Sequence, residues 1–402
     1  MPDLAELKER KGGCVWCGNS PVDHQSTYIF QSISAVISTG DYAMRNVGIY
    51  RFFIRALEDF AQILARAFVT VGEVMGLVHY GEEVEKARSY RSQVVWEEAR
   101  ERGIPMQQVI VGTFRMDAYR AFVNGSWRYF ISLPFPPHLA TTRLWFDDKH
   151  LLKEHLRKEG IPVPGSGVAL TKRRARALFR ELKAPLVVKP RLGSRGRHTT
   201  TNVTDEEALI QAFRSARKLC AHVSIEEELQ GSVCRGTVIG GHLCGFLEAT
   251  PTHIVGDGVR TIQEHIVEKN RTRPARMGEI EVSKEVEQFL ERNRLSLASV
   301  PGEREVVVLT HRTGRLFGGE TRELLETVHP KLKRYLEDAA RALDVPIVGF
   351  DLIIENPEVD PDTQKWGIIE ANTLPFIDLH YLPLKGTPSK TAKAVWDLWE
   401  KA

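Results

Sequence analysis

Apolar residues recur at three- and four-residue intervals between residues 42 and 75, and this period predicts helical structure there. The apolar face contains Phe53, Leu57, Phe60, Leu64, Ala67, Phe68 and Val71. Such a stripe is typical of an amphipathic helix that packs in a core rather than in a membrane, and its length fits either one long helix or a kinked pair. Residues 1–41 look irregular beside it and are expected to form an N-terminal segment without regular structure.

Two further patterns predict an α/β domain over residues 42–146. Residues 92–111 are expected to form a helix, a turn and a strand. Residues 118–133 are expected to form a hairpin centred on Asn124-Gly125, because this dipeptide favours tight two-residue turns.

Helix start and stop signals predict a second domain over residues 147–386. Asp147 or Asp148 can cap a leucine-containing helix that stops at Gly160. The sequence TDEE, from Thr204 to Glu207, has the form of a capping box and is followed by apolar residues on one face. A last helix is expected within residues 387–402.

Two apolar strands of this second domain carry polar residues that suggest a cation site. The run 347–354 follows a helix that Pro330 starts, and it contains Asp351, a carboxylate that is costly to bury without compensation. Glu370 ends another apolar run, and Asn372 follows two positions later on the same face. Carboxylate and amide oxygens suit magnesium. The alternative is that the acids cap helices or form salt bridges.

The composition is that of an ordinary globular protein. Of the 402 residues 42% are hydrophobic, which is enough for roughly two to three domain cores. The 55 basic and 52 acidic residues nearly cancel, so nothing in the composition supports nucleic-acid binding. The first residues lack the apolar core of a signal peptide, and charged residues interrupt the most apolar stretch. No membrane span is expected, and the predicted location is cytoplasmic.

The five cysteines are scattered along the chain, which fits reduced thiols better than a disulfide framework. Only Cys14 and Cys17, in the sequence CVWC, have the spacing of metal ligands. A structural zinc site needs four ligands, and no second Cys-x-x-Cys follows, although His24 or a partner chain could contribute. The alternative is a turn with two free thiols.

Residues 187–198, VVKPRLGSRGRH, predict a strand followed by a loop that could hold phosphate. Glycines allow close backbone approach, and serine and arginine add donors. The loop lacks the Gly-Lys-Ser/Thr ending of a P-loop, so a phosphate-binding loop of another kind is expected.

From about Trp145 to Leu384 the sequence resembles the ATP-grasp carboxylate–amine ligases, and most of all the ATP-grasp part of cyanophycin synthetase and related amino-acid ligases. The motifs that carry the resemblance appear in order as DDK, GIPVP, LVVKPRLGSRGR, SIEEELQG, THIVGDGVRTI, FGGETRELLETVHP, VGFDLII, IIEANTLP and HYLP. The resemblance implies an α/β (α+β) fold of two lobes that hold a nucleotide between them, preceded here by the α/β N-terminal domain.

The resemblance also implies roles for individual residues. Lys149 and Lys189 match lysines on the nucleotide phosphates, and point charges suit that task. The loop residues Gly193, Ser194, Arg195 and Gly196 match a lid over the phosphates. The segment Glu226, Glu227, Glu228 and Leu229 matches the connection between the lobes, where backbone groups meet adenine.

At the reacting end of the site, the resemblance makes Asp351, Glu370 and Asn372 the magnesium ligands, with two ions expected. Arg235 matches an arginine near the phosphates or the acyl intermediate. With Lys189, Ser194 and Arg195 it completes the expected catalytic set. Gly318, Gly319 and His380 match the substrate end, although a lone histidine is more often an ordinary packed residue.

Some positions depart from the family pattern. An acidic residue that often holds the ribose is Val233 here, so the ribose needs another partner, of which Glu228 is one candidate. The second glycine of the loop is His198, and an arginine of cyanophycin synthetases corresponds to Ala249. No segment like GTNGKT follows in this chain. A substrate other than that of cyanophycin synthetase is therefore expected.

The implied activity is ATP-dependent amide or peptide bond formation through an acyl phosphate, with small carboxylate and amine substrates such as amino acids or peptides. A kinase or phosphotransferase could use the same nucleotide site, and a non-catalytic nucleotide-binding scaffold is a third hypothesis. A homo-oligomer is also expected, because ligases of this family are often dimers or tetramers.

Overall fold

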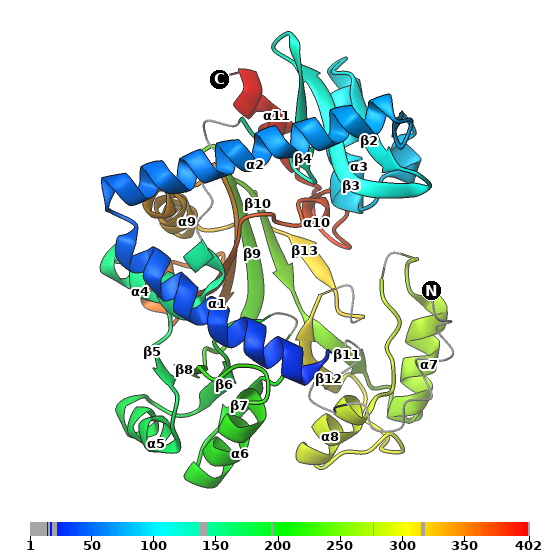
Figure 1. Ribbon diagram of the computed structural model, residues 1–402. Helices are drawn as coiled ribbons and strands as arrows, with labels where there is room; N and C mark the ends of the chain where they lie inside the picture. The colour runs from blue at the N-terminus through cyan, green and yellow to red at the C-terminus, as the bar shows by residue number, and fades with distance from the viewer. Residues whose placement is uncertain are drawn as a thin grey trace.

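The computed structural model describes residues 14, 17, 22–136, 144–193, 196–275, 277–314 and 318–400 of the chain. The expected lid residues Ser194 and Arg195 lie outside these ranges. Two long helices cross one side of the molecule, and behind them lie an N-terminal sheet, a central sheet and a smaller sheet (Figure 1). No helix among the described residues combines the length and the apolar character needed to cross a bilayer.

The first helix corrects the expectation that residues 1–41 are irregular. Helix α1 spans His24–Met44, and α2 spans Gly48–Val74. Asp23 starts α1, because its side chain accepts a hydrogen bond from the backbone N–H of Ser26. Apolar residues at helical spacing before residue 42 were the missed signal. For the predicted stripe the single-helix alternative is the correct one, since α2 carries all seven of its residues without a break. The expectation that this stripe packs in a core is wrong, because its aromatic and leucine side chains are each more than half exposed.

The N-terminal domain is a four-stranded antiparallel sheet in the order β1-β2-β3-β4. Its strands are β1 (Val78–Gly81), β2 (Met106–Val111), β3 (Phe114–Val123) and β4 (Ser126–Ile131). Helix α3 (Tyr90–Glu101) precedes β2, as the sequence predicts. The predicted hairpin is confirmed, since Asn124 and Gly125 at its turn have φ values of 50° and 74°.

The last helix, α11 (Thr391–Glu400), belongs to the core of the N-terminal domain although it is 300 residues away in sequence. The indole N–H of Trp396 donates to the carbonyl of Val95 at 2.9 Å. Arg102, at the end of α3, bonds Asp397 and Glu400 of α11. The expected C-terminal helix is thus present, but it is not a separate unit.

The small sheet, in the order β5-β8-β6-β7, is antiparallel and packs its core against α5 and α6. Its elements are β5 (Ser166–Ala169), α5 (Lys172–Glu181), β6 (Leu186–Pro190), β7 (Thr200–Val203), α6 (Glu206–Ala216) and β8 (Val223–Glu227). Asp205 caps α6 through the N–H of Ala208, which corrects the predicted cap at Thr204 by one residue. The side chains of Thr204 and Asp205 can both accept a capping hydrogen bond, and the backbone conformation at the start of α6 decides which of them is the cap.

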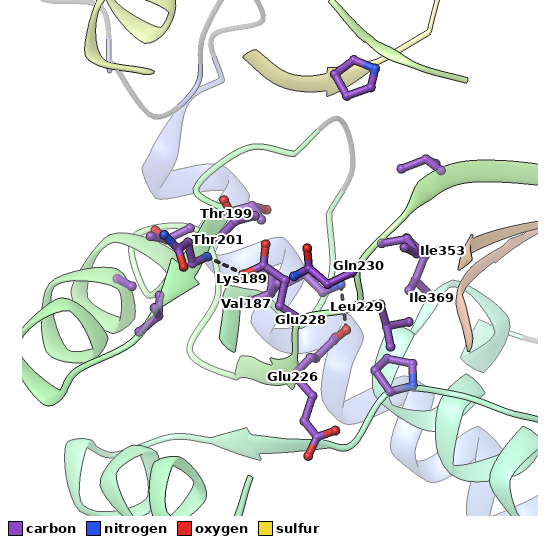
Figure 2. Close-up of a pocket in the computed structure, with 18 of the residues that line it drawn as sticks. Val187, Lys189, Thr199, Thr201, Glu226, Glu228, Leu229, Gln230, Ile353 and Ile369 are labelled. Carbon is purple, nitrogen blue, oxygen red and sulfur yellow. Dashed lines mark hydrogen bonds and ion pairs between the residues drawn. The ribbon is translucent and has the colours of Figure 1, made fainter. Parts of the chain in front are cut away.

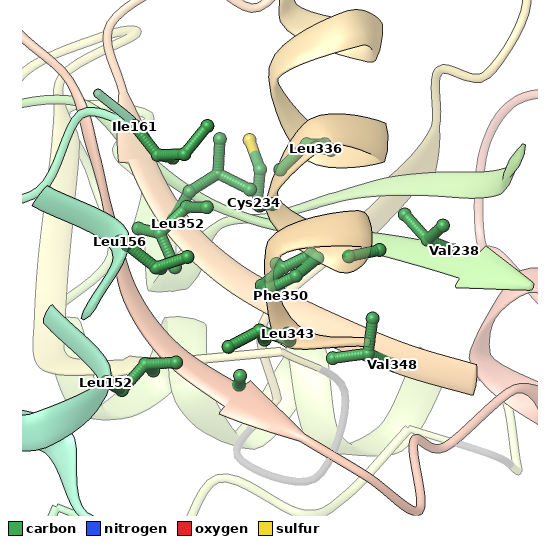
Figure 3. Close-up of a cluster of buried hydrophobic side chains, with 14 of the residues drawn as sticks. Leu152, Leu156, Ile161, Cys234, Val238, Leu336, Leu343, Val348, Phe350 and Leu352 are labelled. Atoms are coloured by element: carbon green, nitrogen blue, oxygen red, sulfur yellow. The ribbon is translucent and has the colours of Figure 1, made fainter. Parts of the chain in front are cut away.

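The central sheet has the order β13-β10-β9-β14-β15 and is also antiparallel. Its strands are β9 (Ser232–Ile239), β10 (His242–Ala249), β13 (Thr321–Glu323), β14 (Ile347–Ile354) and β15 (Gly367–Asn372). Helices α4 (Lys149–Lys158) and α9 (Pro330–Leu343) cover it, and their leucines meet Phe350 in the largest apolar core (Figure 3). Asp148 caps α4 and Pro330 begins α9, as predicted.

A smaller unit is inserted between β10 and β13. Strands β11 (Pro251–Val255) and β12 (Val306–Thr313) pair with each other, and helices α7 (Ile262–Thr272) and α8 (Lys284–Arg292) pack against them. The short helix α10 (Asp378–Tyr381) and the 3₁₀ turns Val84–Lys86, Leu144–Asp147 and Pro361–Thr363 complete the described elements. The turn at residues 144–147 lies where the sequence predicts a domain boundary.

We expect Trp396→Ala to destabilise the N-terminal domain by about 3–5 kcal/mol, because it leaves a large cavity under the sheet. Trp396 is 1% exposed. Chemical unfolding followed by circular dichroism measures the effect. Lys393→Ala on the exposed side of the same helix is the matched control. An equal effect of the two substitutions would mean that α11 does not complete this core.

Candidate functional site

A cavity of about 1140 Å³ lies between the small sheet and the central sheet. It exceeds the usual size of a small-ligand pocket, roughly 300–1,000 Å³, so a nucleotide has room in it. Val187, Leu229, Val233, Ile353 and Ile369 supply apolar walls. In Figure 2, Ile353 and Ile369 lie on one side of the cavity, and Thr199 and Thr201 lie on the other. The cavity therefore offers an apolar slot with polar groups at its margin.

Three charged residues form a row across neighbouring strands of the central sheet. Arg235 on β9 is paired in register with Asp351 on β14, and Asp351 is paired with Glu370 on β15. The Nε and Nη2 atoms of Arg235 each donate to Asp351 at 2.7 Å. Burial alone would lower the pKa of Arg235, but the Asp351 carboxylate outweighs burial and raises it. The antiparallel register thus gathers residues that are 135 positions apart.

Asn372 extends this group of ligand-type residues. It lies two positions after Glu370 on β15, so both side chains project from the same face of the sheet. Its Nδ2 atom is buried and has no hydrogen-bond partner among the described residues. Two carboxylates and an amide oxygen on adjacent strand ends form a donor set that fits magnesium. The predicted set Asp351, Glu370 and Asn372 therefore comes together in the fold.

Lys149 connects this carboxylate group with the glycine-rich loop. It is the first residue of α4, and its Nζ atom lies 3.5 Å from Glu370 Oε2. The same Nζ donates to the carbonyl of Gly193 at 2.6 Å. Gly193 and Gly196 have φ values of 114° and 65°, which favour glycine at both positions. The loop, the lysine and the carboxylates thus meet at one place.

Lys189 shares a buried carboxylate with a lysine that the sequence analysis missed. Glu226 accepts from Lys153 at 2.7 Å and lies 3.0 Å from Lys189 Nζ. Burial alone would raise the pKa of Glu226, but the two lysine charges lower it to about 2. Burial lowers the pKa of Lys153 to about 8, although Glu226 opposes the shift. Lys153 lies on the buried side of α4 beside Leu152 and Leu156. Its position among these leucines was the sequence signal that it is buried and needs a charge partner.

The expected adenine segment divides into different roles. Glu226 is 2% exposed and serves the ion pair just described, while Glu227 pairs with Lys365 at 3.0 Å. All four residues of the segment, Glu226 to Leu229, line the cavity. Glu228 accepts from the backbone N–H of Asn202, and burial raises its pKa. Val233, at the position where the family often has an acidic residue, lies in the wall of the same cavity.

The residues expected at the substrate end, Gly318, Gly319 and His380, all have structural contacts or conformations of their own. His380 is fully buried, with Nδ1 at 2.7 Å from Glu323 and Nε2 at 2.7 Å from Thr237. These contacts fit the packed-histidine alternative better than a substrate contact. Gly319 lies so close to the backbone of Thr250 that a Cβ atom would be 2.3 Å from its carbonyl oxygen. Gly318 has a φ of 81°, so both glycines have structural reasons for their identity.

A second buried ion pair was also missed. The guanidinium Nε of Arg191 lies 2.7 Å from Asp148, and the Nη2 atom of Arg191 donates to Thr39 of α1. Asp148 is fully buried and also caps α4. The sequence shows Arg191 directly after Lys189-Pro190, but its partners are distant in the chain. This pair ties the start of the glycine-rich loop to α1 and α4.

We expect Glu226→Gln to destabilise the protein by about 3–5 kcal/mol at neutral pH, because Lys153 is left buried without its charge partner. The folded-state pKa of Glu226 lies below its usual 4.5, so the folded protein binds fewer protons than the unfolded chain. This stabilisation is present above pH 4.5 and is lost as the pH falls towards 2.

Chemical unfolding of wild type and variant across this pH range measures both effects. Glu207→Gln on the exposed side of α6 is the control. The same acid-induced loss in Glu226→Gln as in wild type would contradict the assignment.

Comparison with known proteins finds similarity to biosynthetic enzymes that join amino acids, as their names indicate. No protein-family model matches the chain. The chain is 29% identical over 271 residues to a glutathione biosynthesis bifunctional protein of Clostridium perfringens, covering 64% of this chain and 34% of that protein. It is 30% identical over 261 residues to a cyanophycin synthetase of Synechocystis, covering 62% of this chain and 30% of that protein. The chain thus spans about a third of the length of these relatives.

A solved structure supports the fold. The bifunctional glutathione synthetase of Pasteurella multocida superposes with a TM-score of 0.53 and 22% sequence identity, over 77% of this chain and 44% of that one. The two curated relatives are ligase-type proteins whose similarity covers about three fifths of this chain. The chain is therefore similar to a glutathione biosynthesis protein and to cyanophycin synthetases over about three fifths of its length, and it carries the ATP-grasp fold.

Proposed function

We propose that the protein is an ATP-dependent carboxylate–amine ligase that forms an amide or peptide bond through an acyl phosphate and releases ADP and phosphate. The observation that carries the proposal is the meeting of Lys149, the glycine-rich loop and the Asp351–Glu370–Asn372 group beside a nucleotide-sized cavity. Relatives named for glutathione and cyanophycin synthesis support amide formation between amino acids or peptides.

The chain's own residues suit this chemistry without an enzyme nucleophile. The apolar walls at Leu229, Ile353 and Ile369 would bind the adenine base, and Glu228 would accept from the ribose. Lys189 and Lys149 would bind the phosphates, and the loop at Gly193 would close over them. Their positive charges offset the charge that gathers on the transferring phosphoryl group.

Asp351, Glu370 and Asn372 would hold magnesium, which would neutralise phosphate charge when bound; two ions are part of the proposal. In the structure the two carboxylates already have cationic neighbours, Arg235 and Lys149. Both cations would turn from the carboxylates towards phosphate oxygens when the substrate arrives. Arg235 would then lie beside the acyl phosphate. This exchange of partners keeps each buried charge compensated.

The substrates are proposed to be small carboxylates and amines of the amino-acid or peptide class. Residues 315–317, next to Gly318, lie outside the described residues. The proposal therefore places the binding site of the amine substrate in the region around Gly318 and names no contact residue for it. The core of the N-terminal domain includes Ile239 and Ile347 of the central sheet, and this domain would contribute to substrate choice. All five cysteines are free thiols, which supports a cytoplasmic location.

Self-association remains a prediction. Helix α2 carries four phenylalanines, Phe52, Phe53, Phe60 and Phe68, each more than half exposed. A contiguous apolar surface of this kind is typical of an interaction site, and a second copy of the chain is the proposed occupant. The mass of the particle in solution would check it.

Incubation of the protein with ATP, magnesium and pooled amino acids or short peptides tests the activity. We expect phosphate release that depends on the pool, together with a product whose mass equals two reactants less one water. A stable phosphorylated substrate would favour a phosphotransferase instead. Nucleotide binding with no turnover on any pool would favour the scaffold hypothesis.

We expect Lys189→Met to lower turnover on the order of a hundredfold or more, because it removes a charge that stabilises the transferring phosphoryl group. Glu370→Gln should lower turnover to a similar extent and raise the magnesium concentration that is needed for half-maximal activity. Lys172→Met, at an exposed position of α5, is the control. Unchanged magnesium dependence in Glu370→Gln would contradict the ligand assignment.

A further inference from the structure

Four side chains of metal-ligand type meet outside the nucleotide cavity. Cys14 and Cys17 come from the N-terminal segment, His24 is the first residue of α1, and His198 follows the glycine-rich loop. One ligand atom from each lies within 4.8 Å of all the others. Cys17 and His198 are buried, and Cys14 and His24 are half-buried. The sequence analysis left a metal site and a simple turn as alternatives for the two cysteines.

Four of the six distances between the ligand atoms are close to the edges of a tetrahedron around one ion. The two Nε2 atoms of His24 and His198 are 3.1 Å apart. The Sγ atoms of Cys14 and Cys17 lie 3.4 and 3.5 Å from His198 Nε2, and Cys17 Sγ lies 3.6 Å from His24 Nε2. Zinc bonds of about 2.3 Å to sulfur and about 2.0 Å to nitrogen give tetrahedral edges of roughly 3.3–3.8 Å.

The surroundings orient the ligands towards the centre of this cluster. His198 Nδ1 lies 2.8 Å from the carbonyl oxygen of Ser215, which can only accept a hydrogen bond. Nδ1 therefore carries the proton, and the lone pair of Nε2 faces the two thiols and His24. A second partner of this kind is usual for a metal-bound histidine. The backbone N–H of Cys17 donates to the carbonyl of Cys14 at 3.0 Å, which holds the cysteine turn.

We propose that Cys14, Cys17, His24 and His198 bind one structural zinc ion. Two thiolates and two imidazoles favour zinc over the hard cation of the nucleotide site. Binding replaces the protons of both thiols, so one Zn²⁺ enters and two protons leave. Four protein ligands complete the coordination, which makes the site structural and leaves no open position for a substrate.

The zinc site would attach the end of the glycine-rich loop to α1. His198 occupies the position of the loop's second glycine and has a φ of 51°, a conformation unusual for a histidine. At the other end of the loop, Arg191 bonds Thr39 of α1, and Ser32 of α1 accepts from the backbone N–H of Ala221. The metal would thus hold the loop at His198, as the contact between Arg191 and Thr39 holds it at the other end.

Metal analysis of the purified full-length chain tests the site without any substitution. After exhaustive dialysis against metal-free buffer we expect close to one zinc per chain by inductively coupled plasma mass spectrometry. Cobalt added to the metal-depleted protein should give the visible bands of tetrahedral Co²⁺ and thiolate-to-cobalt charge-transfer bands. Three results would overturn the proposal. They are a protein without zinc, a protein that holds iron or copper instead of zinc, and an intact mass that shows a Cys14–Cys17 disulfide.

Substitutions then assign the ligands. Cys14→Ser and His24→Gln, at the half-buried positions, should each lower zinc content and abolish the cobalt charge-transfer or shift its bands. Cys244→Ser and His79→Gln are matched controls outside the cluster. Zinc that stays bound in both ligand variants would refute the assignment.

Hydrogen exchange of residues 196–203 should rise at least severalfold when zinc is removed, whereas α9 should not change. This readout does not depend on ligase activity, so it separates the zinc proposal from the proposed function. Unchanged hydrogen exchange after zinc removal would refute the proposal that the metal attaches the end of the glycine-rich loop to α1.

Discussion

The buried ion pair between Lys153 and Glu226 is the interaction on which the site depends. Lys153 belongs to α4, which packs on the central sheet, whereas Glu226 belongs to β8 of the small sheet. Neither charge can remain in the interior without the other. The pair therefore holds the two lobes together at the floor of the cavity. Lys189 contacts the same carboxylate, so the pair also fixes the position of the lysine that we propose for the nucleotide phosphates.

The same need for charge compensation organises the rest of the site. Arg235 and Lys149 neutralise Asp351 and Glu370, and Arg191 neutralises Asp148. Each pair joins elements that are far apart in the chain. A nucleotide with magnesium can enter such a site by exchanging partners. These charges are thus compensated in the absence of a ligand, and they remain available for the proposed phosphoryl transfer.

The N-terminal region supports the glycine-rich loop as well as forming its own domain. Helix α1 contacts both ends of the glycine-rich loop, through Thr39 at Arg191 and through His24 at His198. Helix α11, at the other end of the chain, completes the core of the N-terminal sheet. The proposed zinc ion would add a cross-link between α1 and the end of the glycine-rich loop.

The sequence by itself determined the local elements and the identity of the chemical groups. The hairpin at Asn124-Gly125, the helix that starts at Pro330 and the strand around Asp351 follow from turn chemistry and periodicity. Ordered motifs also indicated the lysines and carboxylates of the site. Tertiary structure alone decided that Lys153 reaches Glu226, that His380 is buried, and that His198 meets Cys14 and Cys17. Periodicity describes one element at a time, whereas these contacts join elements through strand register and packing.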